Sequence, residues 1–345
     1  MTYLWQHLKE TNKPIVLYGM GNGADRLLDY LANLSIPVSG VFASDEFVRG
    51  HSFRGFEVTN YTTAKERFGD MIVLLAFGTQ LPDVMERILR IASEQELYAP
   101  DMPVYGDTFF TPEYAAEHKE DLLRVREMLS DDISRHVFDS IINYRLTGSL
   151  SYLTDCETLV NEAYENILKL TDTETYLDLG AYNGDTVAEF LSHVDHYEKI
   201  IAVEPDPRSF RKLTQNTEGL KNFTSHNLGI SEGAEFIPFS SGAGRGSASA
   251  GKMNKMFPSS SVDNLLAGEK VTYIKMDVEG QERAAIIGAE KTIKQHHPKM
   301  LISCYHRTED IFDLPLLVQS ITPGYKVYIR HHPYFPAWDT NFYFI

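Results

Sequence analysis

The sequence predicts an α/β protein with two doubly wound, Rossmann-like domains joined by a helical connector. Two observations carry this prediction. Apolar strand patterns that end in glycine-rich turns occur at residues 14–24 and 175–184, and each opens a series of alternating strand and helix patterns. Residues 111–170 between the two series show helical periodicity with no strand candidate. We therefore expect domains at 1–110 and 171–345, with the connector at 111–170.

The bulk composition is that of an ordinary folded chain. Its 345 residues favour two domains, and 43% hydrophobic with 23% charged residues argue against disorder. The net charge of −16 argues against nucleic acid as a partner, because phosphates would be repelled. No apolar run is long enough for a membrane span, and the first residues do not form a signal peptide. Two cysteines, Cys156 and Cys304, give no disulfide framework, so a cytoplasmic location is expected.

The first domain is expected to be a small sheet of four or five strands. The strand at 14–18 is followed by a helical pattern at 24–34 and a second strand at 38–43. A buried strand at 71–78 then precedes a helix at 81–95. In the connector, Thr111, Ser130 and Asp131 are capping signals, and we expect its helices to form one wall of the second domain's site.

The turn Asp178-Leu-Gly-Ala-Tyr-Asn-Gly-Asp185 is the strongest ligand signal in the second domain. Gly180 permits a tight bend, and Gly184 lets a ligand approach the helix N-terminus, where free N–H groups favour an anionic group. Asp178 suits a ligand that also carries an ammonium, and Asp185 and Thr186 complete this contact. S-adenosylmethionine, with its methionine carboxylate and ammonium, is such a ligand.

The next strand ends at Glu204, 20 residues after Gly184. A carboxylate at this place can accept both ribose hydroxyls. Asn227, which follows the third strand, is where an adenine contact would fall. The expected cofactor-binding set is therefore Asp178, Gly180, Ala181, Gly184, Asp185, Thr186, Glu204 and Asn227.

Three motifs together resemble the FkbM-type family of S-adenosylmethionine-dependent methyltransferases. They are the 178–186 turn, Val-Glu-Pro-Asp-Pro at 203–207 and Ile-Lys-Met-Asp-Val-Glu-Gly at 274–280, of which the last is the most specific. The similarity covers roughly residues 173–345. It implies a seven-stranded class I methyltransferase fold and O-methylation, commonly of sugars or other hydroxylated natural products. The family usually reads Gly-Ala-Asn-Ile-Gly, so the contacts of Tyr182 and Asn183 are left open.

Catalytic side chains are expected at the carboxyl ends of the fourth and fifth strands, because ligands bind there in open α/β sheets. An alcohol needs a base to become a good nucleophile, and His306 is our first choice for it. A histidine that is only hydrogen-bonded at a strand end is the alternative. Asp277 would orient the hydroxyl, act as the base itself, or ligate a cation.

A magnesium site is conceivable because Asp277, Glu279 and Glu282 are close in sequence. Neighbours on a strand face opposite sides, so the three should not converge, and we predict no required metal.

Two further segments carry alternatives. Residues 240–252, rich in Gly, Ser and Ala, suggest either a solvated flexible loop or a flap over the substrate. Arg330-His331-His332, near Tyr334, Phe335 and Trp338, would suit a sugar ring or an anionic glycan, or would form a solvated loop.

The first domain has its own glycine turn. Gly19, Gly21 and Ala24 fit G-x-G-x-x-A, and Asp45 lies 21 residues beyond Ala24, where a ribose-binding acid of an NAD(P) site would be. The following stretch is similar to the small Rossmann-like domains that precede sugar acyltransferases, which implies a nucleotide-sugar. A domain that only scaffolds the enzyme is the other reading.

The function predicted from these features is O-methylation of a hydroxyl on a saccharide or saccharide-linked intermediate, with S-adenosylmethionine as cofactor. Two alternatives use the first domain: an NAD(P)-dependent oxidoreductase, and a non-catalytic protein that binds a sugar nucleotide. The sequence names neither the acceptor nor the oligomeric state.

Overall fold

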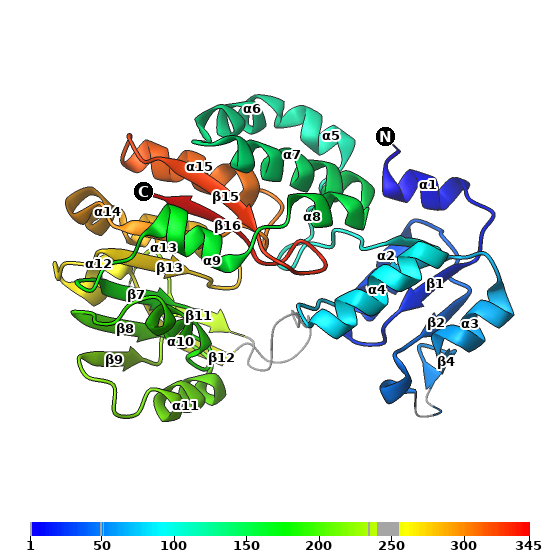
Figure 1. The fold of residues 1–345 in the computed structure, drawn as a ribbon, viewed down its shortest axis with the longest axis horizontal. Helices are drawn as coiled ribbons and strands as arrows, with labels where there is room; N and C mark the ends of the chain where they lie inside the picture. Colours follow the sequence, from blue (N-terminus) through cyan, green and yellow to red (C-terminus); the bar gives the residue numbers. More distant parts are fainter. Residues whose placement is uncertain (1, 49, 51, 234, 240–254) are drawn as a thin grey trace.

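The computed structural model describes residues 2–48, 50, 52–233, 235–239 and 255–345. The glycine-, serine- and alanine-rich segment at 240–252 lies outside these residues. The chain forms two lobes, each built on an open sheet (Figure 1). We call residues 2–110 the N-terminal lobe and residues 111–345 the C-terminal lobe. In the part of the chain that is described, no helix has the length and apolar character needed to cross a membrane.

The N-terminal lobe holds a six-stranded sheet in the order β3-β4-β2-β1-β5-β6, parallel except for the β3–β4 pair. The three strands that the sequence placed are present as β1, β2 and β5, and with β3, β4 and β6 the sheet has six strands instead of the expected four or five. Its strands are β1 (Ile15–Tyr18), β2 (Gly40–Phe42), β3 (Ser52–Phe53), β4 (Phe56–Thr59), β5 (Ile72–Leu75) and β6 (Glu96–Tyr98). Its helices are α1 (Leu4–Glu10), α2 (Asn22–Asn33), η1 (Asp45–Phe47), α3 (Tyr61–Phe68) and α4 (Pro82–Glu94).

The connector is helical, as predicted, and packs onto the C-terminal sheet. Thr111 and Asp131 accept hydrogen bonds from the first-turn amides of α5 and α7, whereas the Ser130 hydroxyl accepts from the amide of Val327. The connector is therefore a structural part of the C-terminal lobe. Its helices are α5 (Pro112–Glu117), α6 (Lys119–Met128), α7 (Asp132–Thr147), α8 (Leu150–Cys156), α9 (Val160–Glu162) and η2 (Ala163–Leu168).

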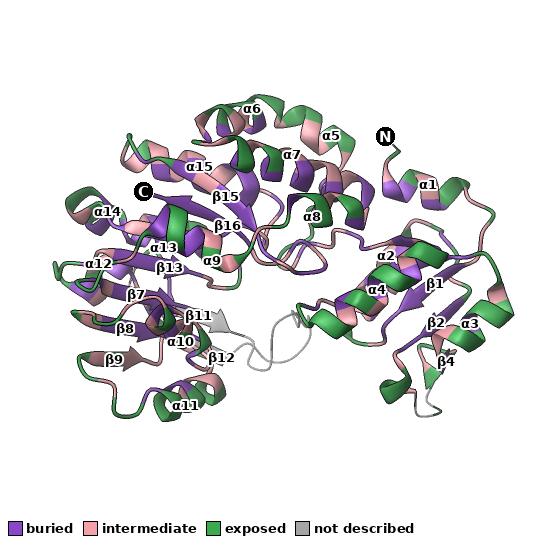
Figure 2. Ribbon diagram, viewed as in Figure 1, coloured by how far each residue is buried: buried purple, intermediate pink, exposed green. Residues whose placement is uncertain are grey.

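The C-terminal sheet has seven strands in the order β15-β16-β14-β13-β7-β8-β9. All neighbours are parallel except β16, which is antiparallel to β14 and β15. The central strands are buried along their length because helices cover both faces, while the edge strand β9 is half-buried (Figure 2). Its strands are β7 (Thr175–Leu179), β8 (Lys199–Val203), β9 (Phe223–His226), β13 (Tyr273–Met276), β14 (Lys299–Ser303), β15 (Val327–His331) and β16 (Thr340–Phe344).

Helices and a small second sheet complete this lobe. A three-stranded sheet, β10-β12-β11, lies between β9 and β13 in the chain. Its strands are β10 (Gly229–Ile230), β11 (Glu235–Phe239) and β12 (Lys255–Ser260). The helices are α10 (Asp185–Ser192), α11 (Pro207–Asn216), α12 (Val262–Leu266), α13 (Glu282–Gly288), α14 (Glu290–His296) and α15 (Asp310–Ile321).

The strand order reverses at β7, where β8 lies on one side and β13 on the other. In open α/β sheets this reversal leaves a crevice at the carboxyl ends of the strands, which is the usual ligand site. A backbone bridge between Thr79, which follows β5, and Phe335 joins the two lobes on this side. The N–H···O distances of the bridge are 2.8 and 3.0 Å. The carboxyl ends of strands from both sheets therefore border one region.

Candidate active site

The glycine turn after β7 is dictated by close packing as well as by backbone conformation. Gly180 has a φ of +88°, and a Cβ built on it would lie 1.8 Å from the carbonyl oxygen of Asp277. Gly184, at φ +91°, precedes the first residue of α10. The glycine at 180 thus lets β13 pass directly beside the turn, which brings Asp277 to it.

The N–H groups at the start of α10 are covered by neighbouring side chains. Asn183 Oδ1 accepts from the amide of Asp185 at 3.2 Å, and Asp185 Oδ1 accepts from the amide of Thr186 at 3.0 Å. A ligand carboxylate that binds these amides, as the sequence predicts, has to replace the two side-chain bonds.

The Asp178 side chain does not lie in the pocket, where the sequence predicts it. Its side chain is fully buried and accepts a hydrogen bond from the Thr186 hydroxyl. Burial raises the pKa of this carboxyl, and the charge of nearby Lys275 opposes the rise. Asp178 is not among the side chains that line the pocket above the turn. The ammonium contact predicted for Asp178 is therefore not supported by its position, whereas Asp185 does line that pocket.

Glu204 is placed as the sequence predicts, at the end of β8 and next to the turn. Its Oε2 accepts from the amide of Tyr182 at 2.9 Å, and its Oε1 accepts from the amide of Asp206 at 2.7 Å. Burial raises the pKa of Glu204 to about 7, although both amides favour the charged form. Each carboxylate oxygen has two acceptor positions, so the amides fix the side chain and leave it able to accept from a ligand.

Asn227 does not point into the pocket. Its Nδ2 donates to the carbonyl oxygens of Glu204 at 2.8 Å and Pro205 at 3.0 Å, so it holds the loop after β8. Leu228 and Ile230, which follow it in the chain, line the pocket instead.

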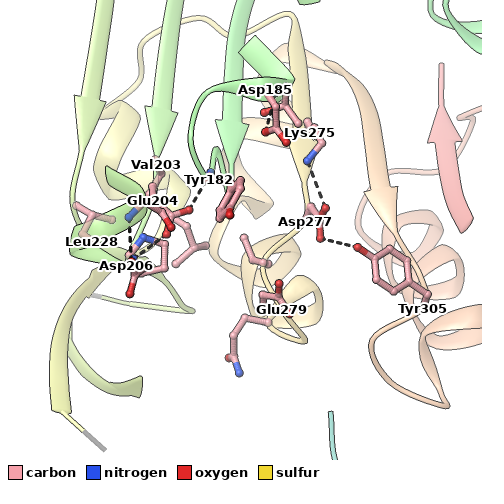
Figure 3. Close-up of a pocket in the computed structure, with 18 residues that line it drawn as sticks. Tyr182, Asp185, Val203, Glu204, Asp206, Leu228, Lys275, Asp277, Glu279 and Tyr305 are labelled. Carbon is pink, nitrogen blue, oxygen red and sulfur yellow. Dashed lines mark hydrogen bonds and ion pairs between the residues drawn. The ribbon is translucent and has the colours of Figure 1, made fainter. Parts of the chain in front are cut away.

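Two connected hollows lie at the carboxyl ends of these strands. The first, which we call the turn pocket, is shown in Figure 3, with Glu204 and Leu228 on one side and Asp277 and Tyr305 on the other. The second, the interlobe cavity, has walls from both lobes. It is lined by Gln80, Val104, Val160, Asp185, Thr186, Glu189, Lys275, Asp277, Glu279, Tyr305, His306, Tyr334, Trp338 and Asp339. As predicted for the connector, one of its residues, Val160, contributes to the wall.

Asp277 stands between two cations where the two hollows meet. Its Oδ2 lies 3.6 Å from Lys275 Nζ, and its Oδ1 lies 3.5 Å from His306 Nε2. The Tyr305 hydroxyl donates to Oδ1 at 3.1 Å (Figure 3). Burial opposes the charged form of Lys275, but the charges of Asp277 and Asp178 outweigh it and raise its pKa. The surroundings of Asp277 therefore stabilise its negative charge.

His306 is buried at the end of β14, where its surroundings favour the imidazolium. Its Nδ1 lies 3.0 Å from Glu282 Oε1, and its Nε2 lies 3.7 Å from Glu279 Oε2. Burial lowers the pKa of this ring, but the charges of Glu282, Asp277 and Glu279 outweigh burial and raise it to about 10. A ring that is already protonated cannot take a proton from an alcohol. The structure thus gives no support to His306 as the general base, although the ring does line the interlobe cavity.

The side chains that could ligate a metal are not the predicted set, because His306 takes the place of Glu279. Ligand-type atoms of Asp277, Glu282 and His306 lie within 4.8 Å of one another. Glu282 is fully buried, and its Oε1 already accepts from the amide of Val278 at 2.8 Å while facing the His306 ring. We read the group as a buried ion pair, and the absence of a metal requirement remains a prediction.

Arg330 and its neighbours have a structural role that the sequence did not predict. Arg330 is 1% exposed and forms ion pairs with Asp131 and Glu162 of the connector, each at 2.8 Å. His331 is also buried. Neither a glycan site nor a solvated loop describes this segment, whereas Tyr334 and Trp338 do line the interlobe cavity.

The glycine turn of the N-terminal lobe is closely packed. A Cβ on Gly19 would lie 2.8 Å from the Phe77 ring, Ala24 is buried in the core, and Gly21 immediately precedes α2. Asp45 is exposed at the start of η1. Neither Asp45 nor Gly21 lines the hollow beside this turn, which is formed by Arg26, Phe77, Trp338 and other mainly apolar residues.

One spacing in the N-terminal lobe is typical of hydride-transfer enzymes and went unnoticed in the sequence. Tyr61 and Lys65 on α3 form a Tyr-x-x-x-Lys pattern, but both side chains donate to Glu94 Oε2, at 3.0 and 2.6 Å. Lys65 and Glu94 are exposed, so the pattern is accounted for by a surface cluster.

The match to a known protein family lies in the C-terminal half of the chain. Residues 178–338 match the family model of the methyltransferase FkbM domain. Residues 178–338 form a methyltransferase FkbM domain. No curated protein matches the chain in sequence. The assignment agrees with the order of the three motifs and with the seven-stranded sheet.

One solved structure extends the likeness of fold to both lobes. The crystal structure of a methyltransferase FkbM from Methylobacillus flagellatus has a TM-score of 0.73 and 22% identity, and the match covers 96% of this chain and 90% of that one. Aeropyrum pernix fibrillarin with bound S-adenosylmethionine has a TM-score of 0.33 and 16% identity, over 51% and 67% of the two chains. A putative methyltransferase from Streptococcus mutans with S-adenosylhomocysteine has a TM-score of 0.36 and 12% identity, and the match covers 55% of this chain and 99% of that one.

The FkbM domain uses S-adenosylmethionine, and the turn pocket fits that cofactor. Glu204 is fixed by two amides beside the apolar Leu228 and Ile230, which suits a ribose joined to a flat base. The acidic Asp185 at the α10 end suits the positively charged groups of the cofactor.

Proposed function

We propose that this methyltransferase transfers the methyl group to a hydroxyl oxygen of a saccharide or saccharide-linked acceptor. The observation that carries the proposal is that the interlobe cavity and the turn pocket share one set of side chains. An acceptor in the cavity meets the cofactor at this shared wall, which is formed by Asp185, Thr186, Lys275, Asp277, Glu279 and Tyr305.

We assign the cofactor contacts by position. Glu204 accepts the ribose hydroxyls, and the adenine lies against Leu228 and Ile230. Asp185 faces the ammonium of the methionine end in place of Asp178. Asp178 instead accepts a hydrogen bond from the Thr186 hydroxyl.

Asp277 is the group we assign to the acceptor hydroxyl. S-adenosylmethionine supplies an electrophilic methyl carbon on a sulfonium. The hydroxyl oxygen forms a bond to that carbon while the carbon–sulfur bond breaks, and its electron pair leaves with sulfur as S-adenosylhomocysteine. Asp277 accepts the hydroxyl proton. Lys275 and His306, on either side of Asp277, hold the carboxylate in place, and Lys275 donates to the reacting oxygen.

A saccharide suits the rest of the cavity. Trp338 and Tyr334, with ring centroids 5.8 Å apart, offer aromatic surface on which the apolar face of a sugar ring can lie. Carboxylates and Gln80 around them accept from hydroxyl groups. In this assignment the N-terminal lobe supplies a wall of the acceptor site, and a nucleotide site at Gly19, Gly21, Ala24 and Asp45 stays a prediction without further support.

The test is formation of S-adenosylhomocysteine from S-adenosylmethionine with a panel of sugars and other alcohols, followed by mass spectrometry of the acceptor. We expect release that depends on a sugar, with the new methyl group on oxygen. Methylation of nitrogen or carbon only, or turnover only with acceptors that are not sugars, would contradict the proposal.

A further inference from the structure

The interlobe cavity is strongly acidic. His306 lines the cavity, but its positive charge is paired with Glu282, which is not part of the lining. Lys275 is the other cation. Against these two stand five carboxylates, which are Asp185, Glu189, Asp277, Glu279 and Asp339.

Two of these carboxylates have no assigned role in the methyl transfer itself. Asp185, Asp277 and Glu279 also line the turn pocket, where the cofactor brings positive charge. Glu189, on α10, and Asp339, just before β16, line only the interlobe cavity. Burial raises the pKa of the Glu189 carboxyl and repulsion from Asp339 raises it further, while the charge of Lys275 and a hydrogen bond with Tyr164 only partly oppose the rise. A cation bound between the two would relieve this repulsion.

Lys275 lines both the interlobe cavity and the turn pocket, and it indicates what binds where they meet. Its side chain is 8% exposed, and Nζ has no hydrogen-bond partner among the described residues, although the cavity and the turn pocket both reach it. A buried ammonium lacking a hydrogen bond calls for an oxygen ligand. It also repels a second ammonium, most strongly beside Asp277, whose Oδ2 lies 3.6 Å from Nζ.

From these contacts we infer that the acceptor is a hydroxylated ring that carries an ammonium group, as an amino sugar does. The inference rests on the proposed function. The ammonium lies between Glu189 and Asp339, the ring lies against Trp338, and a hydroxyl reaches Lys275 and Asp277. The amine is held away from the methyl group, so oxygen is methylated. The acidic lining disfavours phosphorylated sugars and nucleotide sugars.

The experiment is a calorimetric titration of the full chain, first loaded with S-adenosylhomocysteine, with glucosamine, glucose and glucose 6-phosphate. We expect glucosamine to bind about tenfold or more tightly than glucose, and glucose 6-phosphate to bind most weakly. Equal binding of the first two sugars, preference for the phosphate, or no binding of any sugar would overturn the inference.

Two variants locate the ammonium. Asp339→Asn keeps an acceptor for the Asn341 side chain and is compatible with the φ of +66° at this position, because asparagine tolerates left-handed backbone. It and Glu189→Gln should each lower glucosamine affinity several-fold and change glucose affinity much less, because the amide oxygen can still accept from a hydroxyl. Glu66→Gln, an exposed change on α3, is the matched control. If both site variants keep the wild-type preference for glucosamine, the inference fails.

Failure of this inference is separable from failure of the proposed function. If sugars are O-methylated but neutral ones are preferred, only the ammonium site is wrong. If no sugar is methylated in the assay given above, the proposed function fails whatever the titration shows.

Discussion

The carbonyl oxygen of Asp277 occupies the space that a side chain on Gly180 would need. The two residues end the neighbouring strands β7 and β13, and a Cβ on Gly180 would approach this oxygen to 1.8 Å. The turn that binds the cofactor and the strand that carries the proposed base are therefore packed directly against each other. A shift of one must displace the other.

The first prediction tests this contact. Gly180→Ala should destabilise the protein by about 2 kcal/mol or more and weaken binding of S-adenosylhomocysteine at least tenfold, because the backbones of β7 and β13 must separate. Urea unfolding and calorimetry measure the two effects. Gly219→Ala is the control, since Gly219 has nearly the same φ, +87°, with nothing within 4 Å of the added carbon. Equal effects of the two changes would mean that backbone strain alone is responsible.

The second prediction concerns Glu204 and pH. Its pKa of about 7 means that the carboxyl is mostly protonated at pH 6 and mostly ionised at pH 8. Ribose hydroxyls donate to the ionised form, so affinity for S-adenosylhomocysteine should rise about tenfold from pH 6 to pH 8. In Glu204→Gln the affinity should be lower and nearly independent of pH over this range. A pH profile that is the same in both proteins would remove Glu204 from the ribose site.

The third prediction uses the ion pair of His306 and Glu282. Because the folded protein raises the pKa of His306 from about 6.5 to about 10, it holds a proton that the unfolded chain releases within this range. The stability from this pair is complete below pH 6.5 and is lost as pH rises toward 10. Unfolding free energy should thus fall between pH 7 and pH 9, on the order of 2–3 kcal/mol. Glu282→Gln should remove most of that dependence, while Glu218→Gln, at an exposed site, should retain it.

The fourth prediction concerns Asp277 as the group that accepts the hydroxyl proton. Asp277→Asn should lower turnover about 10²- to 10⁴-fold and change affinity for S-adenosylhomocysteine much less, because the amide keeps the shape but cannot accept a proton as a base. Tyr305→Phe removes one hydrogen bond to Asp277 and should have a smaller effect. Near-normal turnover of the asparagine variant would exclude Asp277 as the base.

The fifth prediction tests whether the N-terminal lobe shapes the acceptor site. A Cβ on Gly78 would lie 2.3 Å from the Trp338 ring, so Gly78→Ala should displace that ring. The KM for the acceptor should rise, with little change in affinity for S-adenosylhomocysteine. Gly21→Ala, in the same lobe but with nothing within 4 Å of the new carbon, should behave as the wild type. An unchanged KM in Gly78→Ala would place the acceptor elsewhere.

Local sequence signals predicted which strand ends meet at the turn pocket. The turn at Gly180 and Gly184, the acid Glu204 and Asp277 each follow a strand, and parallel strands bring their carboxyl ends to one edge. The role of Asp178 was harder to predict because it depends on which face of β7 the side chain takes. Asp178 pairs in register with Lys275 under α10, where Thr186 covers it.

The acceptor end was not predictable in the same way. Gln80 and Trp338 are far apart in the chain and meet only because two sheets face each other across the lobe contact. Arg330 looked like a ligand-binding cation, since nothing in its own segment reveals Asp131 and Glu162 in the connector. His306 was placed correctly at a strand end, but its protonation is set by Glu282, which a sequence pattern does not show to be its partner.

The bridge between Thr79 and Phe335 has a consequence for how such enzymes diversify. It sets the loop after β5 beside the loop before β16, and the residues of the cofactor turn take no part in it. Mutations that accumulate in these two loops can change which acceptor is used while the cofactor turn remains under its own selection. The part of the cavity wall at this contact can therefore vary in sequence independently of the cofactor turn.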